Sequence, residues 1–397
     1  MNIRVPYGMS VHDHEEINAI IKTLKTSTQM GVNVKLFEKK IRELFFKKFG
    51  LMTNSGTSAL FLAIESLSLP ANSEVITPVL TFATTISCIV KNNLVPVFTD
   101  VKKSTYCIDE DKIEKLITKR TKALCIPNLI GNLPNWNKIR NISKKYGLIV
   151  IEDSADTLAA TFRKKSTGFF SDISTTSFYG SHIINCAGNG GMVCFNDSKY
   201  YIKAKLLRSW GRNSSLFDDS EKIENRFNVK IEKMPYDAKF IFSEIGYNYE
   251  PSEIGASFGL VQLKKLKKNI KLREKIFKSH NIFFEKYNDF FILPDQNKET
   301  KTCWLAYPLI IKPNKKFDRK KIQIYLEKKN IQTRVIFTGN VLKQPGFKKI
   351  IHKKDPSGFS NANNVMENGF MIALHHGLNH DMLNHMYKTF ENFFKNL

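Results

Sequence analysis

The sequence predicts an α/β protein with a large, mostly parallel β-sheet and a second, smaller α/β domain at its C-terminal end. In the first half of the chain, short apolar segments alternate with amphipathic ones. This rhythm is typical of strands joined by helices that cover both faces of a parallel sheet. A chain of 397 residues is also too long for one ordinary core. We therefore predict two domains, residues 1–259 and residues 260–397.

The elements of the large domain follow from the spacing of its apolar residues. Phe37, Ile41, Leu44 and Phe45 recur at i, i+4, i+7 and i+8, which is one face of a helix. By the same reasoning, helices are expected at 14–24, 34–49, 81–91, 135–146 and 197–208, with another beginning near 56. Strands are expected at 51–56, 74–77, 95–99, 123–126, 148–151 and 192–195. The polar stretch 213–243 lacks periodicity and is expected to be a long loop, a kind of segment that is often functional.

The smaller domain is expected to follow a helix that is capped near Ser252. A long basic helix begins it at about residue 260. Strands 304–311 and 332–336, a helix at 320–328 and a final helical region from residue 380 complete it.

The net charge of +24 raises the question of a nucleic-acid partner. The lysines are scattered over the expected solvated faces of helices, and no nucleic-acid-binding motif is present, so we expect no such partner. The positive charge would instead help to attract anionic substrates. No apolar run approaches the ~20 residues of a membrane span, and the start M-N-I-R-V-P-Y lacks a signal-peptide core. The sequence therefore predicts a cytoplasmic protein with no membrane partner.

The cysteines and histidines do not predict a metal site. Among the six cysteines there is no C-x-x-C pair, and the closest two, Cys186 and Cys194, are eight residues apart. We therefore expect reduced, mostly buried thiols rather than a zinc ribbon or a disulfide scaffold. His376 and His380 have the i, i+4 spacing of a helical ligand pair, but Gly377 between them indicates a loop, so no metal is expected there.

Two stretches have the composition of a ligand site at the carboxyl ends of parallel strands. An apolar strand runs into Glu152 and Asp153, and a β-prone run ends in the stretch S-F-Y-G-S-H-I-I-N-C-A-G-N-G-G from residue 177 to 191. Near the start, N-S-G-T-S-A-L places Gly56 and Thr57 at a strand-to-helix turn. Backbone N–H groups at such a turn form a phosphate cradle, although an ordinary capped helix would look the same.

These stretches belong to a set of blocks that resembles the fold-type I, pyridoxal-phosphate-dependent sugar-nucleotide aminotransferases of the DegT/DnrJ/StrS type. The blocks are Q-M-G-V-N-V-K-L-F-E, N-S-G-T-S-A-L, T-P-V-L-T-F-A-T-T, I-E-D-S-A-D, S-F-Y-x-x-H and G-Y-N-Y. Each block alone is weak, but together they follow the family order over nearly the full chain. The resemblance implies the fold-type I fold, with the cofactor in the large domain.

The resemblance also implies a role for individual residues. Gly56 and Thr57 would bind the cofactor phosphate, Ser177 would add a hydroxyl to it, and Phe82 would stack on the pyridine ring. Asn248, in G-Y-N, would reach the phosphate from a neighbouring subunit, which implies a homodimer with a shared active site.

Two carboxylates are implied to lie at the cofactor ring. Asp153 matches the family's carboxylate beneath the pyridine nitrogen, where an ionised group keeps that nitrogen protonated so that the ring accepts electrons. Asp156 stands where the aminotransferases usually carry glutamine. An acidic residue here looks more like the dehydratase branch of the family.

His182 stands where the family carries the lysine that binds the cofactor covalently. Without that amine, the resemblance implies a non-covalently bound pyridoxamine 5′-phosphate and pyridoxal 5′-phosphate, with His182 as the catalytic acid–base residue. This replacement resembles the sugar-nucleotide 3-dehydratases that act on GDP-4-keto-6-deoxy-D-mannose. The further blocks N-L-I-G-N, R-S-W-G-R, T-R-V-I-F-T-G-N and M-E-N-G-F agree with that branch.

The function that this resemblance implies is removal of the 3-hydroxyl from a nucleotide-linked 4-keto-6-deoxyhexose. The products would be a 4-keto-3,6-dideoxy sugar and ammonia, with an amino donor such as L-glutamate, in dideoxysugar and lipopolysaccharide biosynthesis. Related enzymes that bind an iron–sulfur cluster carry closely spaced cysteines, which are absent here, so no cluster is expected. Two alternatives are a sugar-nucleotide aminotransferase and a catalytically inactive binding homologue.

Overall fold

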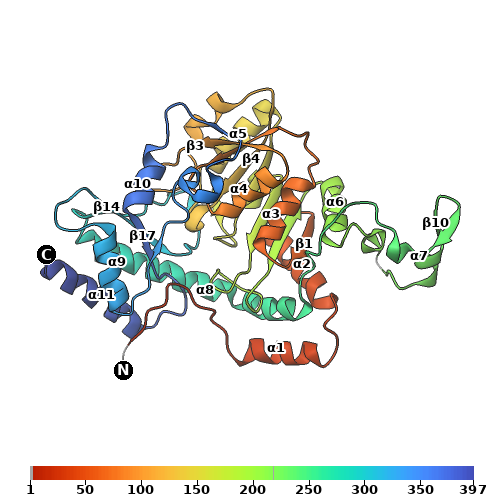
Figure 1. The fold of residues 1–397 in the computed structure, drawn as a ribbon. Coiled ribbons are helices and arrows are strands. Elements are labelled where there is room, and N and C mark those ends of the chain that lie inside the picture. Colours follow the sequence, from red (N-terminus) through yellow and green to blue (C-terminus); the bar gives the residue numbers. More distant parts are fainter. Residues whose placement is uncertain (1–2, 218) are drawn as a thin grey trace.

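The computed structural model describes residues 3–217 and 219–397, so residues 1, 2 and 218 lie outside the description. An eight-stranded sheet in the order β1-β9-β8-β5-β4-β2-β3-β16 forms its centre (Figure 1). The strands are β1 (Phe49–Thr53), β2 (Glu74–Pro78), β3 (Val95–Thr99), β4 (Thr121–Pro127), β5 (Ile149–Asp153), β8 (Ile173–Ser177), β9 (Gly191–Phe195) and β16 (Lys353–Lys354). Only β9 runs antiparallel to its neighbours in this sheet, which confirms the expected mostly parallel α/β architecture.

Helices cover both faces of the large sheet, as the alternation of elements predicted. One apolar layer packs the sheet against α3 (Gly56–Glu65), α4 (Ala83–Lys91) and α6 (Ser198–Arg208). The other face packs against α5 (Trp136–Tyr146) and, near its β1–β9 edge, α2 (Val32–Leu44). Helix α1 (His14–Leu24) lies farther out, against α8. Strands β2, β3 and β9 are buried along their whole lengths because they are covered on both faces.

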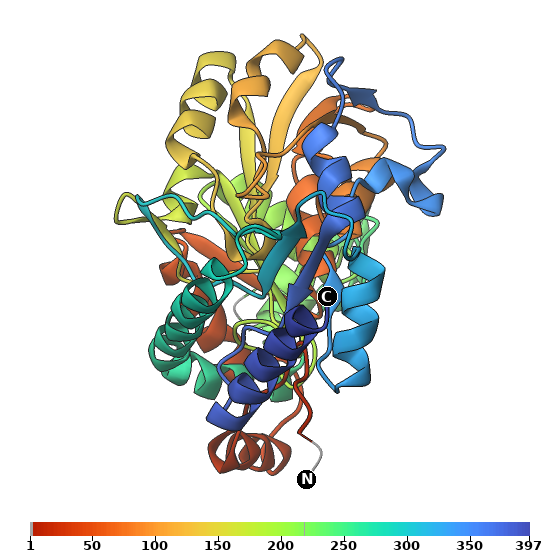
Figure 2. The same ribbon diagram turned by 90° about the vertical axis from the view of Figure 1, so that its left-hand side faces the viewer.

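A second, four-stranded sheet lies in the C-terminal part of the chain and has the order β12-β14-β17-β15. Its strands are β12 (Phe291–Ile292), β14 (Tyr307–Ile311), β15 (Arg334–Val335) and β17 (Gly369–Ile372). The helices of this part are α9 (Arg319–Lys328), α10 (Ser360–Asn368) and α11 (His380–Lys395). Figure 2 shows this part of the chain, drawn in shades of blue, on one side of the large sheet.

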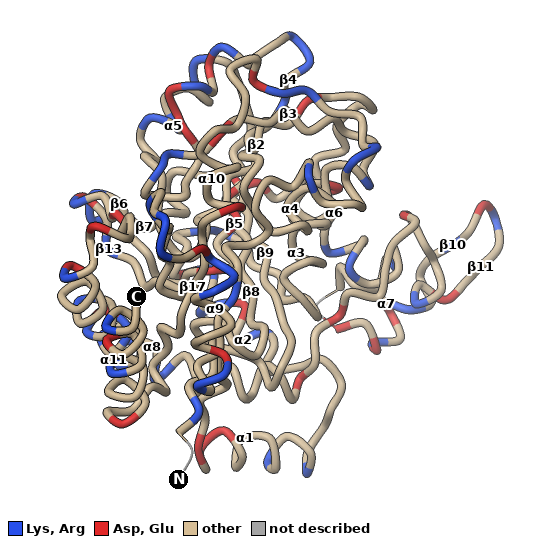
Figure 3. Tube along the Cα trace, turned by 60° about the vertical axis from the view of Figure 1, so that its left-hand side comes forward, with Lys and Arg blue, Asp and Glu red and all other residues tan. Residues whose placement is uncertain are grey.

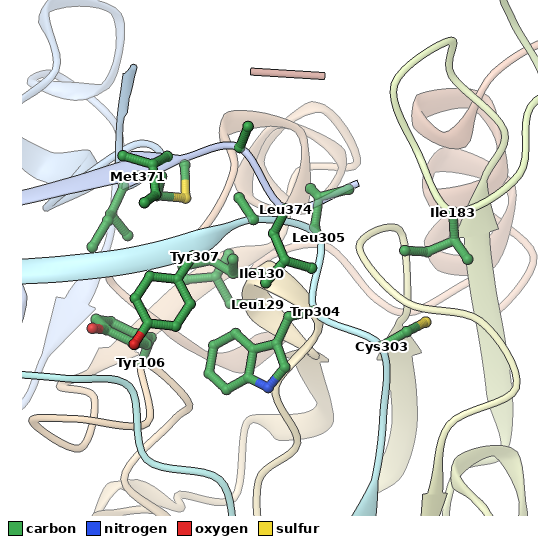
Figure 4. Packing of buried hydrophobic residues seen from close by; sticks show 14 of the residues in the cluster. Tyr106, Leu129, Ile130, Ile183, Cys303, Trp304, Leu305, Tyr307, Met371 and Leu374 are labelled. Atoms are coloured by element: carbon green, nitrogen blue, oxygen red, sulfur yellow. The ribbon is translucent and has the colours of Figure 1, made fainter. Parts of the chain in front are cut away.

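Helix α8 (Glu253–Glu285) joins the two parts without interruption. The predicted boundary between residues 259 and 260 falls inside this helix, so that division stays a prediction. One apolar core also continues from the large sheet into the smaller one: Leu129 and Ile130 of the large part lie beside Leu305 and Tyr307 (Figure 4).

Most expected elements are present with ends that differ by a few residues, but two expectations need correction. The helix expected at 34–49 ends at Leu44, and a strand begins at Phe49. The chain turns at Phe46, whose φ is +55°, and the buried ammonium group of Lys47 donates to the carbonyl oxygens of Gly168 and Ser171, both at 2.6 Å. These long-range bonds end the helix in spite of its apolar spacing.

The stretch 213–243, expected to be a loop, instead contains short regular elements, apart from residue 218, which is not described. They are 3₁₀ turns at Asn213–Leu216 and Ala238–Phe240, helix α7 (Ile223–Phe227) and a hairpin of β10 (Val229–Ile231) and β11 (Met234–Tyr236). Figure 1 shows this stretch projecting from the body of the molecule, and we call residues 213–245 the arm.

The remaining elements are short. A three-stranded ribbon contains β6 (Thr161–Phe162), β7 (Lys165–Ser166) and β13 (Thr300–Lys301). Further 3₁₀ turns lie at Glu110–Lys112, Glu114–Leu116, Leu129–Gly131, Thr167–Phe170, Val341–Lys343 and Pro345–Phe347.

Basic and acidic residues are interspersed over most elements of the fold (Figure 3). Among the described residues, no helix combines the length and the apolar character that a membrane crossing requires. All six cysteines are free and buried, as the sequence predicted.

The N-terminus of α2 is capped by a residue from a distant helix. Gly31, at the N-cap position, has no side chain to cap α2. Instead the buried carboxylate of Glu253, at the start of α8, accepts from the N–H groups of Gly31 at 2.8 Å, Asn33 at 2.7 Å and Val34 at 3.1 Å. This carboxylate satisfies donors that the helix itself leaves free, and it joins α2 to α8.

We expect the Glu253→Ala variant to lose about 1–3 kcal/mol of unfolding free energy, because buried N–H groups then lack an acceptor. Chemical denaturation followed by circular dichroism measures this loss. Glu43→Ala, at an exposed position on α2, is the matched control and should change the unfolding free energy by less than about 0.5 kcal/mol. Equal effects from the two substitutions would show that the cap does not stabilise the fold.

Candidate active site

The carboxyl ends of the parallel strands surround a cavity of about 360 Å³. Open α/β sheets bind their ligands at this edge. Of the residues singled out in the sequence, the structure brings seven to this cavity. They are Gly56, Thr57, Phe82, Asp153, Asp156, Ser177 and His182. Asn248 is the one that does not line it.

One end of the cavity is the N-terminus of α3. Ser55 caps this helix, and its hydroxyl accepts from the N–H of Ser58 at 3.1 Å. A Cβ atom on residue 56 would lie 2.7 Å from the Cβ of Ser177, so glycine allows Ser177 to approach the first turn of the helix. Thr57 is exposed at the same turn. Backbone N–H groups at a helix N-terminus, neighbouring hydroxyls and the helix dipole are features that favour the binding of a phosphate.

Asp153 is the last residue of β5 and is buried at the floor of the cavity. Its carboxylate accepts from the Thr85 hydroxyl at 2.9 Å and from the Ala155 N–H at 3.2 Å. The Thr81 hydroxyl in turn donates to that of Thr85 at 3.0 Å. Burial raises the pKa of Asp153, and within the described residues no cationic side chain pairs with it. A carboxylate held in this way has the chemistry to bind a protonated ring nitrogen.

Asp156 lies one turn farther along the chain, and it is buried as well. Its carboxylate accepts from the N–H of Ile130 at 2.8 Å. Burial, with a smaller contribution from the charge of Asp153, raises the pKa of Asp156 to about 7. Near neutral pH this side chain can therefore either donate or accept a hydrogen bond in the cavity.

His182 lies in the loop between β8 and β9. Hydrogen bonds from Phe178 N–H to Gly190 O and from Gly180 N–H to Gly188 O, both 2.9 Å, hold the two sides of this loop together. The Nδ1 atom of His182 lies 2.6 Å from the carbonyl oxygen of Ala155. Because a carbonyl oxygen only accepts, Nδ1 carries the proton, and Nε2 is the unprotonated nitrogen of the neutral ring.

Burial lowers the pKa of His182 to about 4, and the hydrogen bond to Ala155 O opposes this shift. The free imidazole is therefore neutral at physiological pH and can accept a proton at Nε2. An anionic ligand bound beside the ring would raise its pKa toward neutrality.

The open side of the cavity is aromatic. Phe82 is 51% exposed and meets Phe337 of the C-terminal part edge-on, with ring centroids 5.9 Å apart. The Thr338 N–H donates to the carbonyl oxygen of Thr81 at 2.9 Å, which holds Phe337 beside the site. Tyr179 is also exposed here and packs edge-on against His182.

Sequence reasoning missed several residues that line the cavity or support it. Thr81 and Thr85 lie within the block T-P-V-L-T-F-A-T-T. They are four residues apart in the stretch 81–91 that was predicted to be a helix, and this spacing could have indicated a shared contact. Tyr7 and Phe337 come from opposite ends of the chain, and no local signal identifies them.

Asn248 lies outside the cavity of its own chain, and it is exposed. Its carbonyl oxygen accepts from the side chain of Asn54 at 3.3 Å, and its backbone forms a bridge with Ser209. The expected contact of Asn248 with the phosphate site of a neighbouring subunit stays a prediction.

The pattern of the DegT/DnrJ/EryC1/StrS aminotransferase family matches residues 10–391 of the chain. The chain belongs to this family. Its members depend on pyridoxal phosphate, so the cofactor is pyridoxal 5′-phosphate with its amine form, and the predicted fold-type I fold is confirmed. The cavity fits this group: a helix N-terminus stands at one end, and a buried carboxylate without a cationic partner among the described residues stands at the other.

The chain is similar to three named relatives along much of its length. The lipopolysaccharide biosynthesis protein RfbH of Salmonella typhimurium is 31% identical over 90% of this chain and 84% of its own. The GDP-4-keto-6-deoxy-D-mannose 3-dehydratase of Yersinia pseudotuberculosis is 29% identical over 94% of both chains. The GDP-perosamine synthase of Caulobacter vibrioides is 30% identical over 66% of both.

The fold of the chain is also similar to solved structures of such enzymes. The E. coli GDP-4-keto-6-deoxy-D-mannose-3-dehydratase with bound hydrated PLP has a TM-score of 0.87 at 27% identity and covers 98% of this chain and 100% of its own. A GDP-4-keto-6-deoxymannose-3-dehydratase with a trapped PLP-glutamate geminal diamine has a TM-score of 0.86 at 26% identity and covers 97% and 99%. The chain is therefore a member of a group of PLP-dependent enzymes that modify sugar nucleotides.

The raised pKa of Asp156 predicts a pH-dependent stability in the cofactor-free protein. Between about pH 4 and pH 7 the folded chain holds a proton at Asp156 that the unfolded chain releases, so this group's contribution to stability falls as pH rises. Asp156→Asn removes the titration. The difference in unfolding free energy between the variant and the wild type should therefore change by a few kcal/mol in favour of the variant from about pH 4 to pH 7. Each unit by which burial raises the pKa of Asp156 corresponds to about 1.4 kcal/mol.

Denaturation curves at several pH values measure this difference. Asp289→Asn, at an exposed position, is the matched control and should follow the wild type at every pH. A difference between Asp156→Asn and the wild type that stays constant from pH 4 to pH 7 would contradict the prediction.

Proposed function

We propose that this protein is a 3-dehydratase that acts on a nucleotide-linked 4-keto-6-deoxyhexose, using non-covalently bound pyridoxamine and pyridoxal 5′-phosphate. The observation that carries the proposal is His182, which replaces the family's covalent lysine and has its Nδ1 bonded to Ala155 O at 2.6 Å. A residue in this tautomer can move protons at Nε2, whereas it cannot bind the cofactor covalently.

The residues of the cavity have distinct roles in this proposal. Gly56, Thr57 and Ser177 would bind the cofactor phosphate, Phe82 would pack on its ring, and Asp153 would keep the ring nitrogen protonated. When bound, pyridoxamine phosphate supplies an amine for the 4-keto group of the sugar and a ring that takes up electrons. The buried Thr85 hydroxyl, which accepts from Thr81, donates to the Asp153 carboxylate and would hold it in position for this role.

His182 is the proposed acid–base residue. Its Nε2 would accept a proton from C4′ of the cofactor and return a proton to the departing 3-hydroxyl, so that water leaves. The loop between β8 and β9 and the Ala155 carbonyl fix the ring, which keeps the same nitrogen available for both transfers. Asp156, which lines the same cavity and has a pKa raised to about 7 by burial, would form a hydrogen bond to the cofactor.

The substrate and the amino donor are proposed from the relatives. The dehydratase relative of Yersinia pseudotuberculosis and the E. coli dehydratase structure are named for GDP-4-keto-6-deoxy-D-mannose, and one solved structure holds a PLP-glutamate adduct. We propose the same class of sugar nucleotide, with L-glutamate as donor, and a 4-keto-3,6-dideoxy sugar and ammonia as products. The similarity to RfbH supports a place in lipopolysaccharide biosynthesis. We also propose that the product is used in dideoxysugar biosynthesis and that the enzyme acts in the cytoplasm.

An aminotransferase that keeps the amino group in its product is the second candidate. The GDP-perosamine synthase relative favours it, but that similarity covers only 66% of this chain. His182 favours the dehydratase, because no lysine is present at this position to recapture the cofactor. The third possibility, an inactive homologue, would not need to retain Asp153 with its supporting hydroxyls.

A homodimer is also proposed, and the arm supports it. Among the strands of the described residues, the hairpin of the arm pairs with no other, and an isolated hairpin is at best marginally stable. Large apolar side chains of the arm are nevertheless exposed, namely Leu216, Ile223, Phe227, Ile231, Met234, Tyr236, Phe240, Phe242 and Ile245. The arm holds seven acidic and five basic residues, in a chain of net charge +24, so its charge complements the body of a second copy. Asn248 lies directly after the arm.

The first test of the function uses variants of His182. His182→Asn should still bind the cofactor but lose dehydration by ~10²–10⁴-fold, because the acid–base group is absent. The wild type should release all cofactor on denaturation after borohydride reduction of the pyridoxal form, whereas His182→Lys should retain it covalently and transfer amino groups instead. Mass spectrometry and product analysis by NMR measure both properties. Dehydration by His182→Asn at the wild-type rate would exclude the mechanism.

The second test concerns the dimer. Met234→Ser with Phe240→Ser, which removes two apolar side chains of the arm, should shift the protein toward monomer in analytical ultracentrifugation. Ile351→Ser, at a position that is 76% exposed and outside the arm, should leave the dimer intact. Asn248→Ala should keep the dimer and weaken cofactor retention. A wild-type protein that is monomeric and active would refute the shared site.

A further inference from the structure

A second cavity, of about 800 Å³, has more than twice the volume of the active-site cavity. Helices α2 and α8 form its long walls, and the segments around Leu158 and Cys303 close it. It shares no lining residue with the active-site cavity. We call this cavity the groove.

The floor of the groove is apolar. Leu36 and Leu44 come from α2, and further aliphatic side chains come from α8 and the neighbouring segment. The complete apolar set is Leu36, Leu44, Leu158, Ala159, Leu260, Leu263, Leu266 and Ile270. Along α8 the lining extends from residue 260 to residue 271, about 16 Å at 1.5 Å per residue. A floor of this length suits an alkyl chain.

Lysines surround this floor. They are Lys40, Lys264, Lys267, Lys271 and Lys301, against a single acidic residue, Glu43. Within the described part of the chain, none of the five has a carboxylate within 4 Å. By contrast, Lys265 of the same helix pairs with Asp13 at 2.9 Å and Glu16 at 2.8 Å. Within the described residues, the lysines that line the groove therefore have no ion-pair partner, whereas Lys265 of the same helix does.

The spacing of these lysines has an electrostatic cost. Lys264, Lys267 and Lys271 are separated by three and four residues, so they are neighbours on one face of α8. Like charges at these spacings destabilise a helix. A bound anion would offset this repulsion, and a phosphate monoester, with a charge of about −1.5 to −2 near neutral pH, would offset more of it than a carboxylate.

We propose that the groove binds a single-chain lipid phosphate, with its alkyl chain along the apolar floor and its phosphate among the lysines. The length of the apolar floor and the positive charge of the surrounding lysines together favour this ligand. The body of a second copy carries the positive charge of the chain and would meet these lysines with like charge, which disfavours it as occupant. The proposal does not depend on the reaction catalysed at the other cavity.

Titration calorimetry with dodecyl phosphate, below its micelle concentration and with the cofactor-loaded protein, tests this site. We expect one ligand per chain, with binding weakened by salt. Dodecyl maltoside, which has the same chain and no charge, should bind at least about tenfold more weakly, and inorganic phosphate alone should not bind measurably.

Matched variants locate the site. Lys264→Glu with Lys271→Glu should weaken binding of dodecyl phosphate by about tenfold or more, whereas Lys268→Glu with Lys275→Glu makes the same charge change at exposed positions of α8 outside the groove and should not. Leu263→Gln should weaken binding through the floor, and Leu272→Gln, outside the groove, is its control. Circular dichroism confirms that each variant is folded.

Three results of these binding experiments would contradict the proposal. Equal effects of the two lysine pairs would mean that dodecyl phosphate binds through the general positive charge of the surface, and the proposal would be wrong. Equal binding of dodecyl phosphate and dodecyl maltoside would refute the role of the lysines. Binding of inorganic phosphate as tight as that of dodecyl phosphate would refute the role of the apolar floor.

Discussion

The hydrogen bond between His182 Nδ1 and the carbonyl oxygen of Ala155 is the contact on which the site depends. It joins the loop after β8 to the segment after β5, two neighbouring strands of the sheet. Because it fixes the tautomer, it determines which ring nitrogen can move a proton. Because Ala155 lies between Asp153 and Asp156 in the chain, the same hydrogen bond also ties the imidazole to the segment that carries both carboxylates. A shift of this segment would therefore alter all three groups together.

Glu152 and Asp153, two adjacent carboxylates of β5, differ in how completely the protein itself satisfies their hydrogen-bonding capacity. Successive side chains of a strand point to opposite faces. Glu152 accepts hydrogen bonds from Asn128, Ser154, Ser171 and Ser174, and Ser171 also bonds to the buried Lys47, so this carboxylate is satisfied within the protein. Asp153, on the other face, accepts one hydroxyl and one N–H. Its remaining capacity is directed to the cavity, which is what a cationic ligand requires.

The sequence predicted the sheet and most elements from local patterns, namely apolar periodicity, a glycine turn and carboxylates after a strand. Other residues of the cavity, such as Phe82, Asp156, Ser177 and His182, were predicted only through the resemblance to the family. The sequence could not predict contacts between distant segments. Phe337 lies beside Phe82 only because of the packing of the C-terminal part. The end of α2 is set by Lys47, whose partners are more than 100 residues away in the chain. The hairpin of the arm was missed because each of its strands has only three residues, which is too short for a period of two to be recognised, and five of these six residues are exposed.

The way in which the two parts of the chain are joined restricts access to the site. Val5, near the N-terminus, pairs with Ile331 in the C-terminal part. Strand β16 from that part adds to the edge of the large sheet beside β3. The Thr338 N–H donates to Thr81 O next to the cavity. These bonds lie at separate places, so a hinge rotation that opened the cavity would have to break several of them at once. Ligands are therefore expected to enter without such a rotation, past the exposed rings of Phe82 and Tyr179, which form the open side of the site.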